Sequence, residues 1–183
     1  MSFIQSPNTA TTTLDRDHIV ACARSWLGTP YQHQAAIKGA GTDCLGLVRG
    51  VWRELYGTEP ETPPPYTADW NERHFNTNAQ GRTATGDGAP GQPWNRFVGS
   101  DPLLEAATRH LHARDDECLE PGDVLIFQIT RHGPAKHCGI LTADDRFVHA
   151  YAGRTVVEGW LNRWWRSRIA GVFSFPGSVP WHN

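Results

Sequence analysis

The spacing of apolar residues changes along the chain, and this change restricts the fold more than any other feature. In residues 15–27 and 44–55 apolar side chains recur every three or four positions, which predicts two amphipathic helices. A third, shorter helix is expected at residues 101–112, which begin with Asp-Pro. Short apolar runs between turn residues predict strands at 121–129, 137–142, 146–152 and 168–175. Helices followed by an antiparallel sheet indicate an α+β fold.

The 183 residues are enough for one domain with a hydrophobic core. Residues 1–12 are predicted to be a flexible N-terminal arm, 13–177 a single domain, and 178–183 a C-terminal tail. Within the domain, residues 58–98 are rich in Pro, Gly and polar side chains, so we expect a long insertion there. Residues 159–167 fit either a short helix or an irregular segment.

Composition argues against several classes of protein. The formal net charge is -2 and no basic stretch interleaves with aromatic residues, so no nucleic-acid partner is expected. The four cysteines form no C-x-x-C pair, which favours reduced thiols over a disulfide framework or a zinc ribbon. The first twenty residues lack the features of a signal peptide, and no apolar run is long enough to cross a membrane. We therefore expect synthesis in the cytoplasm without membrane insertion.

The segment T-D-C-L-G-L at 42–47 places Cys44 in the first turn of the second predicted helix. Free N–H groups and the helix dipole at that position favour a thiolate, which is the nucleophilic form of cysteine. Thr42 or Asp43 can cap the helix, and the remaining N–H groups can hold the oxyanion of a tetrahedral intermediate. Taken alone, the pattern fits a buried structural cysteine equally well.

Two histidines lie in neighbouring predicted strands: His137 opens H-C-G-I-L-T, and His149 lies within R-F-V-H-A-Y. If the strands pair through a turn at residues 143–145, the two imidazoles can lie side by side. We interpret His137 as the base for Cys44 and His149 as the group that orients it, although a single histidine is more often a surface residue. Tyr31 either donates to the developing oxyanion or is a core tyrosine.

A zinc site is disfavoured. The residues that could be placed around a zinc ion are His132, His137, Cys138 and His149. However, Cys138 should point away from His137, because neighbours along a strand face opposite sides. The chain also has no H-E-x-x-H motif. We therefore expect no metal and no other cofactor.

Together these segments resemble the NlpC-type family of cell-wall cysteine peptidases. The matching segments are G-T-P-Y at 28–31, T-D-C-L-G-L at 42–47, L-E-P-G-D-V-L-I-F at 119–127, H-C-G-I-L at 137–141 and R-F-V-H-A at 146–150. The resemblance implies a circularly rearranged papain-like fold, with Cys44 as nucleophile, His137 as base and His149 as third member. It also implies that Tyr31 and Asp43 lie beside the oxyanion and substrate site. The implied substrate is the peptide stem of peptidoglycan, often cut between D-Glu and a diamino acid.

Further segments resemble the branch of this family that is encoded among the tail genes of phages and gene transfer agents. They are D-C-L-G-L-V-R-G-V-W-R-E-L-Y-G at 43–57, P-P-P-Y at 63–66, A-K-H-C-G-I-L at 135–141 and W-W-R-x-R-I at 164–169. This resemblance implies tail-tip or hub proteins as partners and action in the host periplasm. The chain departs from the pattern at Leu45, where many members have Ser, and at residues 71–98, which are longer than usual for the branch.

Two other roles remain open from the sequence. The polar arm and the insertion resemble segments that become ordered on a partner, which fits a structural tail-tip protein that uses the fold for docking. An intracellular amidase or acyltransferase can also use the same scaffold, because related folds support several chemistries.

Overall fold

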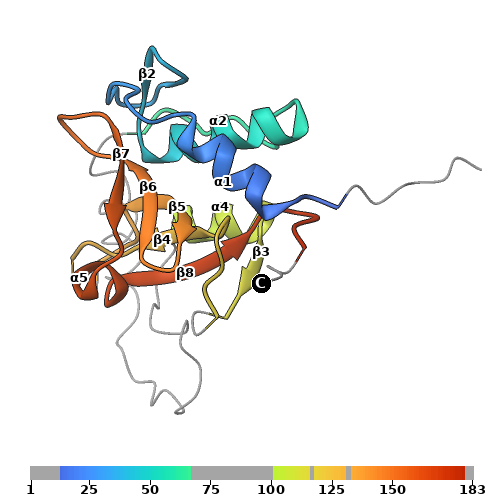
Figure 1. Cartoon of the computed structure of the whole chain (residues 1–183). Coiled ribbons are helices and arrows are strands. Elements are labelled where there is room, and N and C mark those ends of the chain that lie inside the picture. Colours follow the sequence, from blue (N-terminus) through green and yellow to red (C-terminus); the bar gives the residue numbers. More distant parts are fainter. Residues whose placement is uncertain (1–12, 67–100, 116–117, 131–132, 180–183) are drawn as a thin grey trace, which may run out of the picture.

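The computed structural model describes residues 13–66, 101–115, 118–130 and 133–179, and Figure 1 shows how their elements are arranged. The helices are α1 (Arg16–Arg24), α2 (Cys44–Tyr56), α4 (Pro102–His110) and α5 (Arg163–Arg166). The strands are β1 (Ala36–Ile37), β2 (Gly41–Thr42), β3 (His112–Arg114), β4 (Val124–Phe127), β5 (His137–Ala143), β6 (Arg146–Ala150), β7 (Val156–Trp160) and β8 (Ile169–Ser174). β1 and β2 form a small sheet, and the others form a six-stranded antiparallel sheet in the order β3-β8-β4-β5-β6-β7. The architecture is α+β, as the sequence predicts.

The two faces of the six-stranded sheet are covered by different parts of the chain. α1 and α2 lie side by side over one face (Figure 1). The core on that side includes Ile19, Trp26, Leu47, Val51, Val124, Ile126, Cys138, Ile140 and Val148. The core on the opposite side consists of Leu125, Phe127, Leu141, Phe147, Leu161 and Val172, with Trp165 of α5 packed against it. Successive strand residues alternate between the two cores because their side chains point to opposite faces.

Local sequence fixes where α1 and α2 begin and how closely they approach each other. The Asp15 side chain accepts a hydrogen bond from the N–H of Asp17 at 3.0 Å and caps α1, and Asp43 caps α2 in the same way. The turn after α1 lies close to α2 because Gly50 has no side chain: a Cβ atom there would lie 2.1 Å from the Trp26 ring. This contact sets the position of α2, and hence of Cys44, above the sheet.

The sequence predicted most of these elements. The helices expected at 44–55 and 101–112 are confirmed as α2 and α4, and the four expected strands are confirmed as β4, β5, β6 and β8. The first helix ends at Arg24 instead of residue 27, because the chain turns there toward Gly28, which has a φ of +82°. Within residues 159–167 the short helix α5 forms, which is one of the two alternatives. The sequence pattern did not indicate β3 or β7.

Several expectations concern parts of the chain beyond those described. The N-terminal arm at 1–12 and most of the insertion, residues 67–100, lie outside the described residues. At the other end, Ser178 and Val179 pair with Leu14, so backbone pairing continues past residue 177. In the part of the chain that the structure describes, no helix has the length and apolar character needed to cross a membrane.

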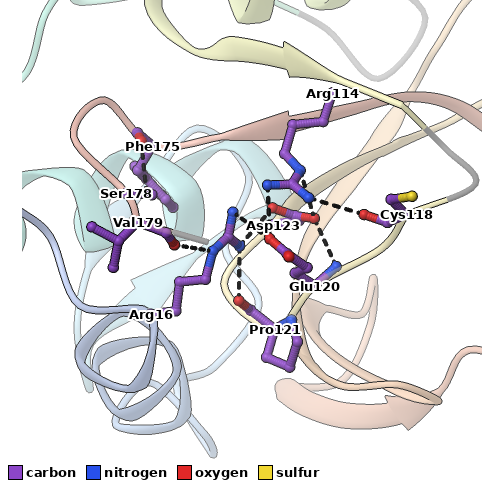
Figure 2. Close-up of polar contacts among 9 residues, drawn as sticks. All are labelled: Arg16, Arg114, Cys118, Glu120, Pro121, Asp123, Phe175, Ser178 and Val179. Carbon is purple, nitrogen blue, oxygen red and sulfur yellow. Dashed lines mark hydrogen bonds and ion pairs between the residues drawn. The ribbon is translucent and has the colours of Figure 1, made fainter. Parts of the chain in front are cut away.

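A buried arginine joins α1 to the turn before β4 (Figure 2). Arg16 is 1% exposed, and its guanidinium lies 2.8 Å from Asp123 and 3.1 Å from Glu120. It also donates to the carbonyl oxygens of Pro121, at 2.9 Å, and Val179, at 2.7 Å. A guanidinium this deeply buried requires such a full set of acceptors.

A second arginine reaches the same two carboxylates from β3 (Figure 2). Arg114 lies 2.8 Å from Glu120 and 3.4 Å from Asp123. Asp123 is fully buried and also accepts the N–H of Glu120 at 2.9 Å. The L-E-P-G-D segment is therefore a structural joint between the N-terminal helix, the edge strand β3 and the C-terminal end of the domain.

Replacing Arg16 with Met should lower the free energy of unfolding by about 3 kcal/mol, because Asp123 would stay buried without its nearest cation. Arg24→Met is the matched control: Arg24 pairs with Glu158, but its side chain is 45% exposed, so its loss should cost less than about 1 kcal/mol. Urea unfolding of both variants measures the difference, and equal losses would contradict the structural role assigned to Arg16.

Candidate active site

The site begins at the first turn of α2, where Cys44 is the first helical residue. Asp43 is 3% exposed; its Oδ1 accepts the N–H of Gly46 at 2.7 Å, and its carbonyl oxygen accepts the N–H of Leu47 at 2.9 Å. Among the described residues, this leaves the N–H groups of Cys44 and Leu45 as the first-turn donors that can face an oxyanion.

The loop at residues 32–35 is held tightly against this helix start. Asp43 Oδ2 accepts the N–H of Gln34 at 2.7 Å, and the Asp43 N–H donates to the carbonyl oxygen of Ala35 at 3.3 Å. The approach requires Gly46, because a Cβ atom there would lie 1.9 Å from that carbonyl oxygen. Gln34 adopts a φ of +62°, which is uncommon for a residue other than glycine. The glycine of D-C-L-G therefore shapes the rim of the site.

The pairing of β5 with β6 brings the two histidines together, through the turn that the sequence predicts. His137 opens β5, and its Nε2 lies 2.9 Å from Nδ1 of His149 in β6. Two glycines make room for the His149 side chain: a Cβ atom at Gly139 would lie 3.2 Å from its Cβ, and one at Gly159 in β7 would lie 3.3 Å from its Nε2. A side chain at Gly139 would also collide with Phe147 and the carbonyl oxygen of Val148, each 2.8 Å from a Cβ atom there, and one at Gly159 would press on the imidazole.

Aromatic rings surround the imidazole pair. The Phe147 ring stacks on His149 with 4.4 Å between centroids, and the Trp165 centroid lies 5.4 Å from each imidazole. Burial in these surroundings, together with the charge of His137, lowers the pKa of His149 to about 3. His149 is therefore neutral near pH 7, and when His137 is protonated on both nitrogens its Nε2–H donates to Nδ1 of His149. The other nitrogen of His137 is then available to the thiol.

The Cys44 sulfur contacts two successive residues at the start of β5. A hydrogen bond from Cys138 lowers the pKa of Cys44 most, and the hydrogen bond and charge of His137 lower it further. Burial and the charge of Asp43 act in the opposite direction, but the pKa of Cys44 stays well below that of an ordinary thiol. The hydrogen bond to Cys44 and burial raise the pKa of Cys138, which therefore remains the protonated donor.

Tyr31 lies on the rim of the site. Its N–H donates to the carbonyl oxygen of Arg154 at 3.0 Å, and its backbone bridges to Thr42, two residues before Cys44. Burial, followed by the charges of Asp43 and Cys44, raises the pKa of Tyr31, so its hydroxyl stays protonated and can act as a donor. Its role beside the oxyanion stays a prediction.

The structure brings together all the side chains that the sequence singled out as site residues: Tyr31, Asp43, Cys44, His137 and His149. Cys138 belongs to the core under the helices, whereas His137 lies beside Phe127 and Trp165 on the other side, as strand alternation predicts. Within the described ranges, no group of three or more His, Cys, Asp or Glu side chains is arranged to hold a metal ion.

Three contacts at the site were not predicted. Cys138 touches the Cys44 sulfur, Trp165 covers the imidazoles, and the Tyr66 hydroxyl donates to Asp43 Oδ2 at 2.6 Å. Strand alternation places Cys138 on one face but does not say which helix residue lies above it. Tyr66 belongs to the P-P-P-Y segment, whose sequence gives a stiff chain but no contact partner.

These groups can perform acyl transfer through a covalent intermediate. A thiolate, a base in contact with it, an orienting neutral imidazole and free N–H groups are the parts that such a reaction requires. The family described as NlpC/P60 matches residues 28–174, a range that includes Tyr31, Cys44 and both histidines. The chain belongs to the NlpC/P60 family.

Individual relatives of this NlpC/P60 domain are distant. A protein named gamma-DL-glutamyl hydrolase from Bacillus subtilis (strain 168) is 23% identical over 167 residues, which cover 90% of this chain and 31% of the relative. The chain thus spans about a third of the length of that curated relative.

Solved structures of the same family share the fold. An NlpC/P60 family protein from Bacillus cereus ATCC 10987 has a TM-score of 0.57 at 20% identity, covering 91% of this chain and 42% of that one. NlpC2 from Trichomonas vaginalis has a TM-score of 0.52 at 17% identity, covering 93% and 48%. The expected papain-like fold of the NlpC type is therefore confirmed.

Cys138→Val should raise the pH at which half of Cys44 reacts with iodoacetamide, because the thiolate loses its strongest hydrogen bond. Cys138→Ser keeps a hydrogen-bond donor at this position, so it should raise the pH midpoint of Cys44 alkylation less. Cys22→Val is the control, since Cys22 is another buried thiol whose hydrogen bond goes to Glu54, at 3.2 Å. Peptide mass spectrometry of the alkylated Cys44 measures the rate, and identical profiles for Cys138→Val and the control would contradict the assigned contact.

His149 should make stability depend on pH. In the unfolded state His149 is protonated below its ordinary pKa of 6.5, whereas in the folded state it stays neutral until about pH 3. The contribution of His149 to the free energy of unfolding is therefore complete above pH 6.5. It falls by about 1.4 kcal/mol for each pH unit below that value. The difference in unfolding free energy between the wild type and His149→Gln should shrink when urea unfolding is repeated from about pH 7 to about pH 5. A constant difference would argue against a buried neutral imidazole.

Proposed function

We propose that this chain is a cysteine endopeptidase that hydrolyses the peptide stems of peptidoglycan, at the bond between D-Glu and a diamino acid. The observation that carries the proposal is the set Cys44, His137 and His149: His137 lies beside Cys44 and helps to lower the pKa of its thiol, and His137 Nε2 lies 2.9 Å from His149 Nδ1. Membership of the NlpC/P60 family and the printed name of the Bacillus subtilis relative, a gamma-DL-glutamyl hydrolase, support the same reaction class.

The first half of the reaction forms a thioester. The Cys44 sulfur attacks the carbonyl carbon of the scissile amide, and the oxygen takes up negative charge beside the N–H groups of Cys44 and Leu45. The C–N bond then breaks, and the leaving amine takes a proton from His137. His149 does not exchange protons in these steps, because burial keeps it neutral. It acts by holding the His137 ring in place.

The second half restores the enzyme. A water molecule attacks the thioester carbon and gives its proton to His137, so the same imidazole serves first as acid and then as base. The C–S bond breaks, the carboxylic acid leaves, and Cys44 returns to the thiolate. The aromatic rings around His137 keep bulk water from one side of this ring, which preserves its pairing with Cys44.

We extend the proposal to the place of action: the tail tip of a phage or gene transfer agent, with tail-tip or hub proteins as partners and the host periplasm as the compartment. This part rests on the resemblance of the four longer sequence segments alone. Mass spectrometry of purified particles tests it, because the protein should be present in wild-type particles and should co-purify with tail proteins after the particles are disrupted.

A cavity beside the site favours a second candidate function, an amidase or acyltransferase that acts on an apolar acyl chain. The cavity has a volume of about 240 Å³ and is lined mainly by apolar side chains, including Leu45, Trp52, Leu103, Leu111 and Cys138. The cavity therefore reaches Cys138, whose hydrogen bond lowers the pKa of Cys44, and Leu45, the residue after the nucleophile. An aliphatic chain would gain free energy by entering such a space.

Product analysis separates the two functions. The purified protein should convert the stem tetrapeptide L-Ala-γ-D-Glu-diaminopimelate-D-Ala into two dipeptides under reducing conditions, as measured by liquid chromatography with mass spectrometry. Cys44→Ala should lower the rate at least about 10³-fold, because members of such a set act as a unit. Cys118→Ala is the control, since Cys118 is exposed and lies outside the site.

Cleavage that survives in Cys44→Ala would contradict the proposed nucleophile. Hydrolysis of a long-chain acyl amide, with none of the tetrapeptide, would favour the second candidate instead.

A further inference from the structure

The P-P-P-Y segment at 63–66 ends inside the site, although the proposed reaction assigns it no part. The Tyr66 hydroxyl donates to Asp43 Oδ2 at 2.6 Å. Its carbonyl oxygen accepts hydrogen bonds from His33 Nε2, at 2.8 Å, and from the side-chain amide of Gln34. The His33 ring meets the Tyr66 ring edge-on, with 5.1 Å between centroids and 85° between planes. Tyr66 is thus fixed at both its backbone and its ring.

The proline run prepares this contact. Three consecutive prolines restrict the backbone before Tyr66, so less conformational entropy is lost when the tyrosine docks. The segment ends against the same loop, residues 32–35, that is held to the start of α2 by Asp43. Tyr66 therefore closes a ring of contacts in which the Asp43 carboxylate is the common acceptor.

The negative charge of the Asp43 carboxylate opposes ionisation of the nucleophile, Cys44. The Asp43 side chain is 4% exposed, so water screens its charge poorly. That charge raises the pKa of Cys44, the direction that disfavours the thiolate. Asp43 is nevertheless needed, because its Oδ1 caps α2 through Gly46 and its Oδ2 holds the loop through Gln34.

The Tyr66 hydroxyl can reduce this effect of the Asp43 charge on Cys44. Its hydrogen carries partial positive charge and points at the carboxylate, with 2.6 Å between the hydroxyl oxygen and Asp43 Oδ2, and so partly offsets the negative charge. Burial, the bond to Asp43 and the charges of Asp43, Cys44 and Cys138 all raise the pKa of Tyr66. The hydroxyl therefore stays protonated and remains a donor near neutral pH.

We propose that Tyr66 is a positioning residue of the catalytic centre, whose hydroxyl holds the Asp43 carboxylate in place and screens its charge from the Cys44 sulfur. The inference depends on Cys44 being the nucleophile of the proposed function. Its test measures the reactivity of the sulfur and needs no wall substrate, so it can fail or succeed independently of the proposed substrate.

Other groups that act on Cys44 come from every element around it. They are His137 and Cys138 from β5, Asp43 from the start of α2, and Tyr31 from the loop after α1. His149 acts through His137, and His33 lies 3.6 Å from Asp43. Substituting Tyr66 alone leaves all of these in place, which is why a single hydroxyl can be tested.

The test compares Tyr66→Phe with Tyr56→Phe. Tyr56 also donates its hydroxyl to one acceptor, the carbonyl oxygen of Pro176 at 2.7 Å, but it lies at the far end of α2. The midpoint of Cys44 alkylation against pH should rise by about one unit in Tyr66→Phe, which makes the reaction about tenfold slower on the acidic side. Tyr56→Phe should keep the wild-type profile. Melting temperatures of both variants show how much stability each lost hydroxyl contributes.

A double-mutant cycle identifies the cause of the shift. Asp43→Asn removes the charge but keeps an oxygen for the Gly46 N–H, so the alkylation midpoint should fall. Adding Tyr66→Phe to this background should then change the midpoint little, because the charge that Tyr66 screens is gone.

Three outcomes would overturn the proposal: a Tyr66→Phe profile that coincides with the wild type, the same upward shift with and without the Asp43 charge, or a Tyr66→Phe protein that does not fold. The last would show that the hydroxyl is a structural requirement.

Discussion

The contact between the first turn of α2 and the start of β5 is the interaction on which the rest of the site depends. Cys44 reaches both His137 and Cys138 only because α2 lies at a fixed height and direction over the sheet. The close packing of Trp26, just after α1, against Gly50 of α2, and the core that both helices share with β4, β5 and β6, set that position. The Arg16 joint then ties α1 to the strand turn before β4 (Figure 2). Packing far from the Cys44 sulfur thus places it beside the two residues that lower its pKa.

Opposing electrostatic effects meet at this contact, and their balance decides the protonation of the sulfur. Burial and the Asp43 charge favour the neutral thiol, whereas the hydrogen bonds from Cys138 and His137 and the charge of His137 favour the thiolate. The second group prevails in this structure. His149 contributes by remaining neutral, because a second positive imidazole at 2.9 Å would repel the positive charge of His137. The aromatic surroundings that keep His149 neutral are therefore part of the catalytic arrangement.

Much of the fold could be predicted because each of the longer helices buries one apolar face, and because the four predicted strands are short apolar runs buried largely on both faces. The pairing of His137 with His149 followed from strand alternation and one short turn, which are local features. β7 was missed because V-V-E-G-W does not alternate between apolar and polar residues, and its Gly159 matters only through its distance from His149. β3 is a short edge strand with exposed residues, so its sequence carries little signal. Cys138, Trp165 and Tyr66 act across long sequence separations, and no spacing rule indicates such contacts.

Thiolate absorbance in the ultraviolet tests the central claim, a charged sulfur at position 44, most directly. The spectrum of Cys44→Ser is subtracted from that of the wild type across a pH titration, so that only the absorbance of this sulfur remains. The account predicts that the difference signal persists on the acidic side of the ordinary thiol pKa of about 8.5 and disappears only when the pairing with His137 is broken. A signal that appears only as the pH rises through about 8.5 would show an ordinary thiol, and the proposed chemistry would then lack its nucleophile.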